Sequence, residues 1–436
     1  MKVKKTISLF IVILSCLLLF DIHGSALFAQ DWAKPSIINQ QRVDLRSLGY
    51  PHVNEIPEYN SAITSLLTAG NGMIYGGTTG EEAYLFLFNP VTNKVRHLGR
   101  IPGQESIHHS LAEDSLGRLY IGTGRNMFDK IDLSREKNWE QIDSSLWDDI
   151  TAYYQDYRGG PLYRYHPKES NHHVKLSYMN AAVEDLGIPV AHNSIYALTS
   201  SPDGSTIYGI TYPDARFFLY HVSEERFELK GTIDEKIVFH GPERFWRSVC
   251  RDLICDKQGR VYFSGTEGVL KYYSPGTDTF ESTGRKIPGD YYPAQFYQDY
   301  AVVEYFDRDT SGKIYGGTSD GYLFVFNPGE GELRNLGKPR AKRRLRCLGV
   351  GKDGKVYLMA GERPVTSSVP CKLYVYDPQN PGFKDYGMII ADRSPHYYRR
   401  GYQFDSMTTG ADGTIYLGES EYRSNLFLLM PPLKNN

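Results

Sequence analysis

The stretch Ser311-Gly-Lys-Ile-Tyr-Gly-Gly-Thr318 decides the fold, because the chain repeats its pattern six more times. Each copy has a small polar turn, an aliphatic residue, a tyrosine and then Gly or another small residue. The other copies lie at 70–78, 116–123, 203–211, 258–266, 353–360 and 412–419. Self-similarity at a period of roughly 40–50 residues is typical of the blades of a β-propeller.

Every repeat has the same internal order of strands. An alternating apolar strand leads into the polar turn, and the tyrosine strand follows it. A third strand ends in an aromatic-Asn/Asp-Pro step at 85–90, 323–328 and 373–378, and a fourth ends in Leu-Gly at 95–99, 183–187 and 333–337. We therefore predict an all-β, seven-bladed β-propeller with four antiparallel strands per blade. A β-sandwich, the alternative, would not repeat its turn so regularly.

The two ends of the chain complement each other. The last repeat stops after its third strand, at 425–430, and has no fourth strand. Near the amino terminus, 42–49 looks like an isolated fourth strand that ends in Leu-Gly. We predict that this N-terminal strand joins the C-terminal blade and closes the propeller, which removes two exposed sheet edges.

The amino terminus has the pattern of a secretory signal. Three lysines precede the apolar run 7–20, and small residues follow before Gln30. We expect a signal peptide at 1–29 and a single propeller domain at 30–436. The protein would be exported to the periplasm or the outside of the cell, most simply as a monomer. Lipid attachment at Cys16 is the less favoured alternative. No later segment has the roughly 20 apolar residues of a membrane span.

Composition narrows the possible partners. The chain has 49 Lys and Arg against 51 Asp and Glu, so its net charge of −2 disfavours a nucleic-acid-binding surface. Its 34 tyrosines suggest sugar-facing surfaces, although inner strands of propellers also use tyrosine. Four cysteines follow the signal peptide, without CxxC spacing, and isolated buried thiols are the favoured interpretation over disulfides. No cofactor is required, and a divalent Ca or Zn ion remains possible.

Strand order predicts which loops share a face. The loop before each first strand and the loop between the second and third strands must emerge on the same face. The long insertion at about 125–158 is the loop between the second and third strands of blade two. On this face we expect a basic, aromatic and histidine-bearing site. Its predicted catalytic residues are His109, His192, Tyr212 and Arg216, with His109 and His192 at equivalent positions. Its predicted substrate-binding residues are His108, Arg247, Arg346, Tyr402 and Gln403.

These residue types suit chemistry on an acidic sugar. Arginine pairs with carboxylates, tyrosine stacks on sugar rings, and histidine exchanges protons near neutral pH. Removal of the C5 proton of a uronate needs a neutralised carboxylate, a base and a proton donor for the leaving oxygen. Tyr212 is the predicted donor. Structural histidines and a solvated loop at 340–346 are the competing interpretations.

The signal, the blade motifs and the Ile107-His-His-Ser110 stretch resemble a group of bacterial carbohydrate-active propellers. The group includes ulvan lyases and propellers that remove terminal L-rhamnose from glucuronic acid on arabinogalactan. The resemblance to the lyases implies a His/Tyr/Arg cluster, which maps onto His109, His192, Tyr212 and Arg216. The resemblance to the rhamnose-removing members implies one key histidine near the mature amino terminus, and His52 is the residue that could match it.

Two functions follow as hypotheses. The first is a polysaccharide-degrading enzyme that acts on a uronic-acid-containing glycan, at a terminal rhamnose–glucuronate linkage of arabinogalactan or a related acidic polysaccharide. It would be a β-eliminating lyase or an α-L-rhamnosidase. The second is a non-catalytic propeller that binds acidic glycans or acts as a scaffold.

Overall fold

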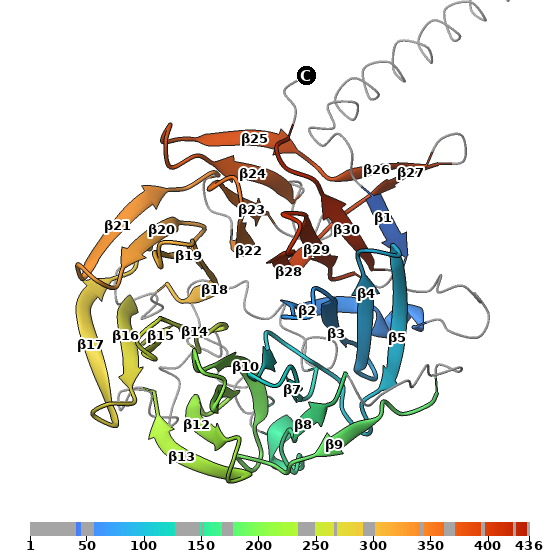
Figure 1. Ribbon diagram of the computed structural model, residues 1–436, viewed down its shortest axis with the longest axis vertical. Coiled ribbons are helices and arrows are strands. Elements are labelled where there is room, and N and C mark those ends of the chain that lie inside the picture. The colour runs from blue at the N-terminus through green and yellow to red at the C-terminus, as the bar shows by residue number, and fades with distance from the viewer. Residues whose placement is uncertain are drawn as a thin grey trace, which may run out of the picture.

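The strands form a ring of sheets around a central axis (Figure 1). The computed structural model describes residues 41–44, 56–126, 149, 152–167, 178–233, 249–265, 268–290, 301–340, 344–361, 371–393, 397–421 and 424–433. Within these ranges there are seven four-stranded antiparallel sheets and one two-stranded hairpin. The predicted all-β, seven-bladed propeller is confirmed.

The blades follow one another in chain order. A 3-10 turn, η1 (Glu58–Asn60), precedes blade one. Blade one is β2 (Ala62–Thr68), β3 (Ile74–Thr79), β4 (Tyr84–Asn89) and β5 (Lys94–Arg100). Blade two is β6 (Leu111–Glu113), β7 (Leu119–Gly122), β8 (Leu162–Tyr165) and β9 (Val183–Asp185). Blade three is β10 (Ser194–Ser200), β11 (Thr206–Tyr212), β12 (Arg216–His221) and β13 (Arg226–Thr232).

The second half repeats the arrangement. Blade four is β14 (Ile254–Cys255), β15 (Val261–Ser264), β16 (Val269–Ser274) and β17 (Thr279–Lys286). Blade five is β18 (Val303–Arg308), β19 (Ile314–Thr318), β20 (Leu323–Asn327) and β21 (Glu332–Gly337). Blade six is β22 (Leu345–Val350), β23 (Val356–Ala360), β24 (Lys372–Tyr376) and β25 (Phe383–Gly387). The hairpin of β26 (Ile390–Arg393) and β27 (Tyr397–Arg400) comes next.

The last blade contains both ends of the chain. β28 (Phe404–Thr409), β29 (Ile415–Glu419) and β30 (Asn425–Leu429) supply its first three strands. β1 (Gln41–Asp44) pairs antiparallel with β30, from Gln41 opposite Leu428 to Asp44 opposite Asn425. The predicted closure by an N-terminal strand is therefore confirmed.

The tyrosine of each repeated stretch is a core residue. All seven are at most 5% exposed: Tyr75, Tyr120, Tyr208, Tyr262, Tyr315, Tyr357 and Tyr416. In three blades the phenol donates a hydrogen bond to an aspartate of the turn, over 3.2 Å from Tyr120 to Asp114, 3.1 Å from Tyr262 to Asp256 and 2.8 Å from Tyr357 to Asp353. Because these phenols are buried, this part of the tyrosine content does not mark a sugar-facing surface.

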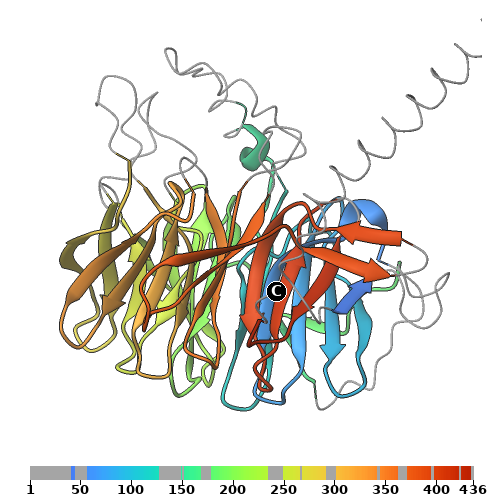
Figure 2. The same ribbon diagram turned by 90° about the horizontal axis from the view of Figure 1, so that it is seen from above.

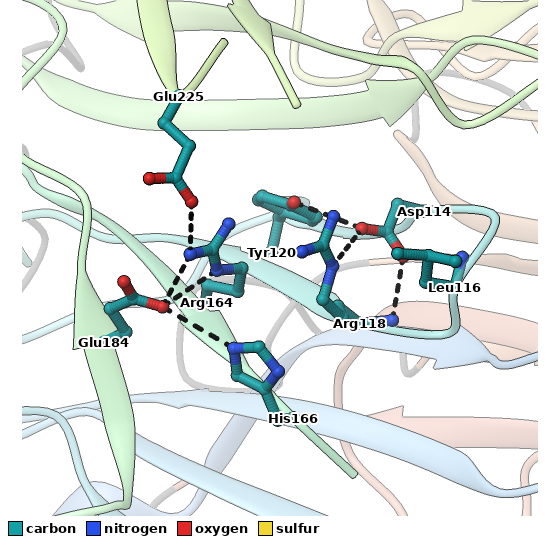
Figure 3. A network of polar contacts seen from close by, with 8 residues as sticks. All are labelled: Asp114, Leu116, Arg118, Tyr120, Arg164, His166, Glu184 and Glu225. Atoms are coloured by element: carbon teal, nitrogen blue, oxygen red, sulfur yellow. Dashed lines mark hydrogen bonds and ion pairs between the residues drawn. The ribbon is translucent and has the colours of Figure 1, made fainter. Parts of the chain in front are cut away.

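Neighbouring blades are also tied together by charge (Figure 3). The buried Arg164 of β8 reaches Glu184 of its own blade at 2.8 Å and Glu225 of blade three at 2.7 Å. Nearby, Asp114 accepts hydrogen bonds from Arg118 and Tyr120 within blade two. The network stabilises the contact between blades two and three and lies away from the propeller axis.

The insertion of blade two lies where the strand order predicts. β7 ends at Gly122 and β8 begins at Leu162, so residues 125–158 connect the second and third strands. Residues 152–155 form a short helical turn, which stands above the sheets in Figure 2. We call this side of the propeller the upper face. Since second strands end here, the first strand of each blade begins here.

Two further sequence predictions concern the core and membranes. Cys250, Cys255, Cys347 and Cys371 are buried free thiols, which confirms the favoured interpretation. Among the described residues, no helix is long and apolar enough to span a bilayer.

Candidate active site

Innermost strands carry a recurring β-bulge near their upper ends. The pairing of first and second strands skips one residue in blades one, three, five, six and seven. A bulge leaves the extra residue outside the ladder and re-aims its side chain. The skipped residues are Thr64, Tyr196, Glu304, Arg346 and Asp405. Five blades therefore have one polar residue each at the bulge position of the innermost strand.

The other two blades supply charged or basic side chains at the corresponding point. In blade two these are His108 and His109, just before β6, and in blade four it is Arg251, just before β14. Arg344 precedes β22 in blade six. We define the axial ring as His108, His109, Tyr196, Arg251, Glu304, Arg344, Arg346 and Asp405.

Glu304 is the buried centre of one half of the axial ring. Its side chain is 3% exposed, and each of its oxygens faces a different arginine. Arg251 of blade four approaches Oε2 at 3.4 Å, and Arg344 of blade six contacts Oε1. A carboxylate from one blade thus joins the cations of the two blades that flank it.

Asp405 has a similar role in the other half. Arg346 of blade six contacts its Oδ1, and Gln403 donates a hydrogen bond to its Oδ2 over 3.1 Å. Gln403 also donates to Ser420 Oγ over 3.1 Å. Both carboxylates of the ring are therefore held by arginines of the propeller itself.

Aromatic contacts join the ring on its blade-two side. The His108 imidazole lies edge-on to Tyr196, with ring centroids 5.1 Å apart. The Arg251 guanidinium stands over the Tyr196 ring at 5.9 Å. His109 packs edge-on against Tyr305 of blade five, and the two ring centroids are 5.0 Å apart. This contact reaches across the propeller axis. These contacts connect blades two, three, four and five at the axis.

The arginines keep both ring carboxylates ionised. Burial raises the pKa of Glu304, but the charges of Arg251, Arg344 and Arg346 outweigh it and the net pKa is lowered. Burial likewise opposes the effect of Arg346, Ser420 and Arg251 on Asp405, whose pKa falls to about 2. Three arginines and two carboxylates leave one formal positive charge in the ring.

The two histidines are neutral at physiological pH. Burial, the neighbouring His109 and Arg251 lower the pKa of His108 to about 3. Burial and Arg251 lower the pKa of His109 to about 4. Desolvation and a nearby cation both disfavour an imidazolium. The site therefore combines neutral imidazoles with guanidinium groups.

The structure brings four of the ten predicted site residues together. His108, His109 and Arg346 belong to the axial ring, and Gln403 supports it through Asp405. Arg346 is consequently part of an ion pair in the channel and not of a solvated loop. Tyr212 lies one layer outside, 2% exposed, between the rings of Tyr154 and Tyr196 at 5.7 and 5.3 Å.

The other predicted residues lie elsewhere. His192 is exposed, has a left-handed φ of 60° and bonds through Nδ1 to the Tyr157 carbonyl at 2.8 Å. The predicted equivalence of His109 and His192 is wrong, because the parallel bridge of His109 is with Ala197, next to Tyr196. Arg216 begins the third strand of its blade, and Tyr402 lies under Arg400 at 5.0 Å on the rim. His52 and Arg247 lie outside the described residues.

Sequence reasoning missed five of the eight residues of the ring. Arg251, Glu304, Arg344, Asp405 and Tyr196 were not among the predicted residues. A signal for them exists: Tyr196, Glu304 and Asp405 lie 12, 11 and 11 positions before the repeated tyrosines Tyr208, Tyr315 and Tyr416. Counting back from the repeated tyrosine would have found the bulge position in the five blades that have one.

No metal centre is evident in the part of the chain that the structure describes. Groups of three or more His, Cys, Asp or Glu that could hold an ion are absent from these ranges. The ring has too few carboxylates that are not held by arginine to attract a divalent ion. Whether the protein uses a cofactor stays a prediction.

Comparisons with known proteins identify the fold but not a family or a function. No protein-family model and no curated protein sequence matches the chain. Virginiamycin B lyase from Staphylococcus aureus, solved as a catalytically inactive histidine-to-alanine variant with quinupristin, is similar at 10% identity and a TM-score of 0.56, over 90% of this chain and 99% of that one. A fungal alcohol oxidase of the AA5 family with copper has 14% identity and a TM-score of 0.54, over 90% and 76%. The WD40 propeller of Doa1 has 9% identity and a TM-score of 0.50, over 90% and 98%. The chain thus has a propeller fold that is also found in a lyase, in an alcohol oxidase and in a WD40 domain.

Proposed function

We propose that the protein is an exported lyase that cleaves a uronic-acid-containing glycan by β-elimination, with the axial ring as its active site. The favoured linkage, carried by the family resemblance, is a terminal rhamnose–glucuronate bond of arabinogalactan or a related acidic polysaccharide. Export is supported by the amino-terminal sequence pattern.

The observation that carries the proposal is the pairing of neutral imidazoles with arginines. His108 lies against Tyr196, and Arg251 stands over the same Tyr196 ring at 5.9 Å. A uronate carboxylate at Arg251 would be neutralised there, which acidifies the adjacent C5 proton. The same carboxylate would offset the charge of Arg251 and so raise the pKa of the base beside it.

His108 is the better candidate for that base. The Nδ1 atom of His109 is buried without a hydrogen-bond partner, and its ring is packed against Tyr305. His108, in contrast, has no buried unpartnered nitrogen and lies at a partly exposed position. Its imidazole therefore remains accessible to a substrate.

The proposed step balances without a cofactor. His108 accepts the C5 proton of the uronate, the C4–O bond breaks, and a C4–C5 double bond forms. The departing oxygen takes up a proton, which the His108 imidazolium can supply. The axial ring contributes the base and the carboxylate-neutralising cation, which are the two groups that such an elimination needs.

The ring carboxylates favour elimination over hydrolysis. A glycosidase requires one carboxylic acid that is protonated at working pH and a second that is ionised. Asp405 has a pKa of about 2, and the pKa of Glu304 is also lowered by arginines. Neither is suited to donate a proton at neutral pH. The hydrolytic alternative would use residues other than these two carboxylates, such as His52, which lies outside the described ranges.

The experiment is incubation with gum arabic and with ulvan. Ultraviolet absorbance of an unsaturated uronate is the expected result, and it should be lost by at least about 100-fold in His108→Gln but not in the distant control His221→Gln. Released L-rhamnose without this absorbance would show that the protein is a hydrolase and not a lyase. Binding of either glycan without any product would show that the protein is a non-catalytic propeller that binds acidic glycans.

A further inference from the structure

We propose that Thr64, the bulge residue of blade one, is a positioning residue that fixes the backbone from which the His108 imidazole projects. This rests on the proposed role of His108 as the base. Of the five bulge residues named above, only Thr64 lies outside the axial ring. Its hydroxyl contacts the segment that enters blade two instead.

The Thr64 hydroxyl holds the peptide bond that precedes His108. It donates a hydrogen bond to the carbonyl oxygen of Ile107 over 2.6 Å. This carbonyl and the backbone nitrogen of His108 belong to one peptide unit, which is planar. A donor that fixes the carbonyl therefore also fixes the plane that leads to the Cα atom of His108. The contact lies one peptide bond away from the proposed base.

A second threonine keeps the Thr64 hydroxyl in this direction. The Oγ1 atoms of Thr64 and Thr79 are 2.7 Å apart. A hydroxyl has a single proton, and Thr64 donates its own to Ile107, so Thr79 is the donor in the second bond. Thr79 is the last residue of β3, and its backbone forms a bridge with Ser106. Both threonines are therefore tied to the segment that carries His108.

The chain on either side of His108 is anchored to a different blade. Before it, the Ile107 amide donates to a carbonyl of β3 in blade one over 3.1 Å. After it, the His109 carbonyl accepts from the Leu198 amide of blade three over 3.0 Å. The His108 ring itself packs edge-on against Tyr196, which also belongs to blade three. Blade one thus places the backbone of the base, and blade three supports its ring.

Such control is what a base for a carbon-bound proton requires. The accepting nitrogen has to lie within hydrogen-bond reach of that proton, and a displacement of about 1 Å can lower the rate by about 100-fold. The bulge makes the contact possible, because the extra residue leaves the ladder and its side chain is re-aimed. We infer that blade one uses its bulge to place the base, whereas four other blades use theirs for a side chain of the ring.

The test removes the hydroxyl but keeps the shape of the side chain. Thr64→Val should lower kcat toward gum arabic by about 10–100-fold with a much smaller change in KM, because the base is displaced and the arginines of the ring are not. Thr64→Ser keeps the donor and should retain most of the activity.

Thr409→Val is the matched control. The Thr409 hydroxyl donates to the Val350 carbonyl of the neighbouring blade over 3.0 Å, from the last residue of β28. The substitution removes the same kind of bond between blades, at the opposite end of an innermost strand, and should leave kcat unchanged. Equal kcat values in Thr64→Val and Thr409→Val would overturn the proposal.

NMR of ring-labelled histidine gives a readout that does not depend on activity. The His108 signals, assigned with His108→Gln, should shift or broaden in Thr64→Val and keep their wild-type positions in Thr64→Ser and Thr409→Val. Thr64→Ala compared with Thr64→Ser isolates the hydroxyl again and serves if Thr64→Val does not fold. Unchanged His108 signals in a folded variant without the hydroxyl would overturn the positioning role. If the wild type acts on no uronate, these spectra still decide the role of Thr64, while the proposed function alone fails.

Discussion

Tyr305 of blade five meets His109 of blade two across the propeller axis, with ring centroids 5.0 Å apart and ring planes inclined by 64°. The Tyr305 hydroxyl donates to the Met407 carbonyl of blade seven over 2.5 Å. One side chain therefore joins three blades that are not consecutive in the ring. This cross-brace holds His109 in place and distinguishes it from His108, whose ring packs against Tyr196.

The cross-brace predicts that Tyr305→Phe lowers stability more than activity. The ring contact with His109 remains, but the Met407 carbonyl loses its donor. The expected decrease in the free energy of unfolding is about 1–3 kcal/mol, the usual effect of leaving a buried acceptor unpaired. Chemical denaturation would measure it, with Tyr402→Phe on the rim as the control. A loss of kcat without a loss of stability would instead place Tyr305 in the chemistry.

Arg251→Gln tests the carboxylate-binding part of the ring. We expect kcat/KM toward a uronate to fall by at least about 100-fold, which corresponds to the loss of roughly 3 kcal/mol of interaction. Arg251 also lowers the pKa of His108, so the pKa of the free imidazole should rise in the variant. Steady-state kinetics and histidine NMR would measure the two effects.

A matched substitution shows whether the charge itself matters. Arg251→Lys should retain more affinity than Arg251→Gln, because it keeps the cation but loses the planar guanidinium. Equal affinity of all three proteins for the uronate would contradict a carboxylate site at Arg251.

The pKa of His109 predicts how stability changes with pH. Its folded-state pKa is about 4, below the value of about 6.5 for an unfolded chain. As the pH falls from 6.5 to 4, the unfolded state therefore binds a proton that the folded state does not, and the free energy of unfolding decreases. His109→Gln should reduce this slope by up to one proton.

Urea denaturation at several pH values between 4.5 and 7 measures that slope. His97 provides the comparison away from the ring, because burial also lowers its pKa to about 4. His97→Gln should reduce the slope in the same way without a change in the acid limb of kcat/KM. A slope that is identical in the wild type and His109→Gln would exclude a neutral, buried His109.

The repeated tyrosines predict a purely structural set of substitutions. Tyr120→Phe and Tyr262→Phe each remove a hydrogen bond to a buried aspartate, at 3.2 Å and 3.1 Å. Each should lower the free energy of unfolding by about 1 kcal/mol. The two effects should add in the double variant, since the residues lie in blades two and four and share no partner. Neither substitution should alter kcat. A loss of activity without a loss of stability would indicate that these tyrosines contact the sugar.

Which residues meet at the axis was predicted only in part. The signal in the sequence for His108 and His109 is strong, because two adjacent histidines precede the second repeat. Arg346 and Gln403 were also among the predicted residues; Gln403 lies on the loop before blade seven as predicted, whereas Arg346 lies within β22 and not on the loop before it. Glu304 and Asp405 were missed because an acidic residue inside an alternating strand looks like an ordinary solvent-facing position. His192 was overvalued because its loop resembles that of His109 in composition.

The amino-acid sequence is enough to predict the number of blades, the order of strands in each blade and the strand shared between the termini. These features depend on local alternation and on turn residues, and each repeat contains both. Which side chains lie at the axis depends on how the strands pair in the folded protein. A bulge inserts one residue into the first strand and shifts every later side chain to the opposite face. Tyr196 and Glu304 lie at the axis for this reason, although each is only one position away from a residue of the core. Pairing between strands sets that register, and the seven copies of the repeat determine a functional site only when the blades close into a ring.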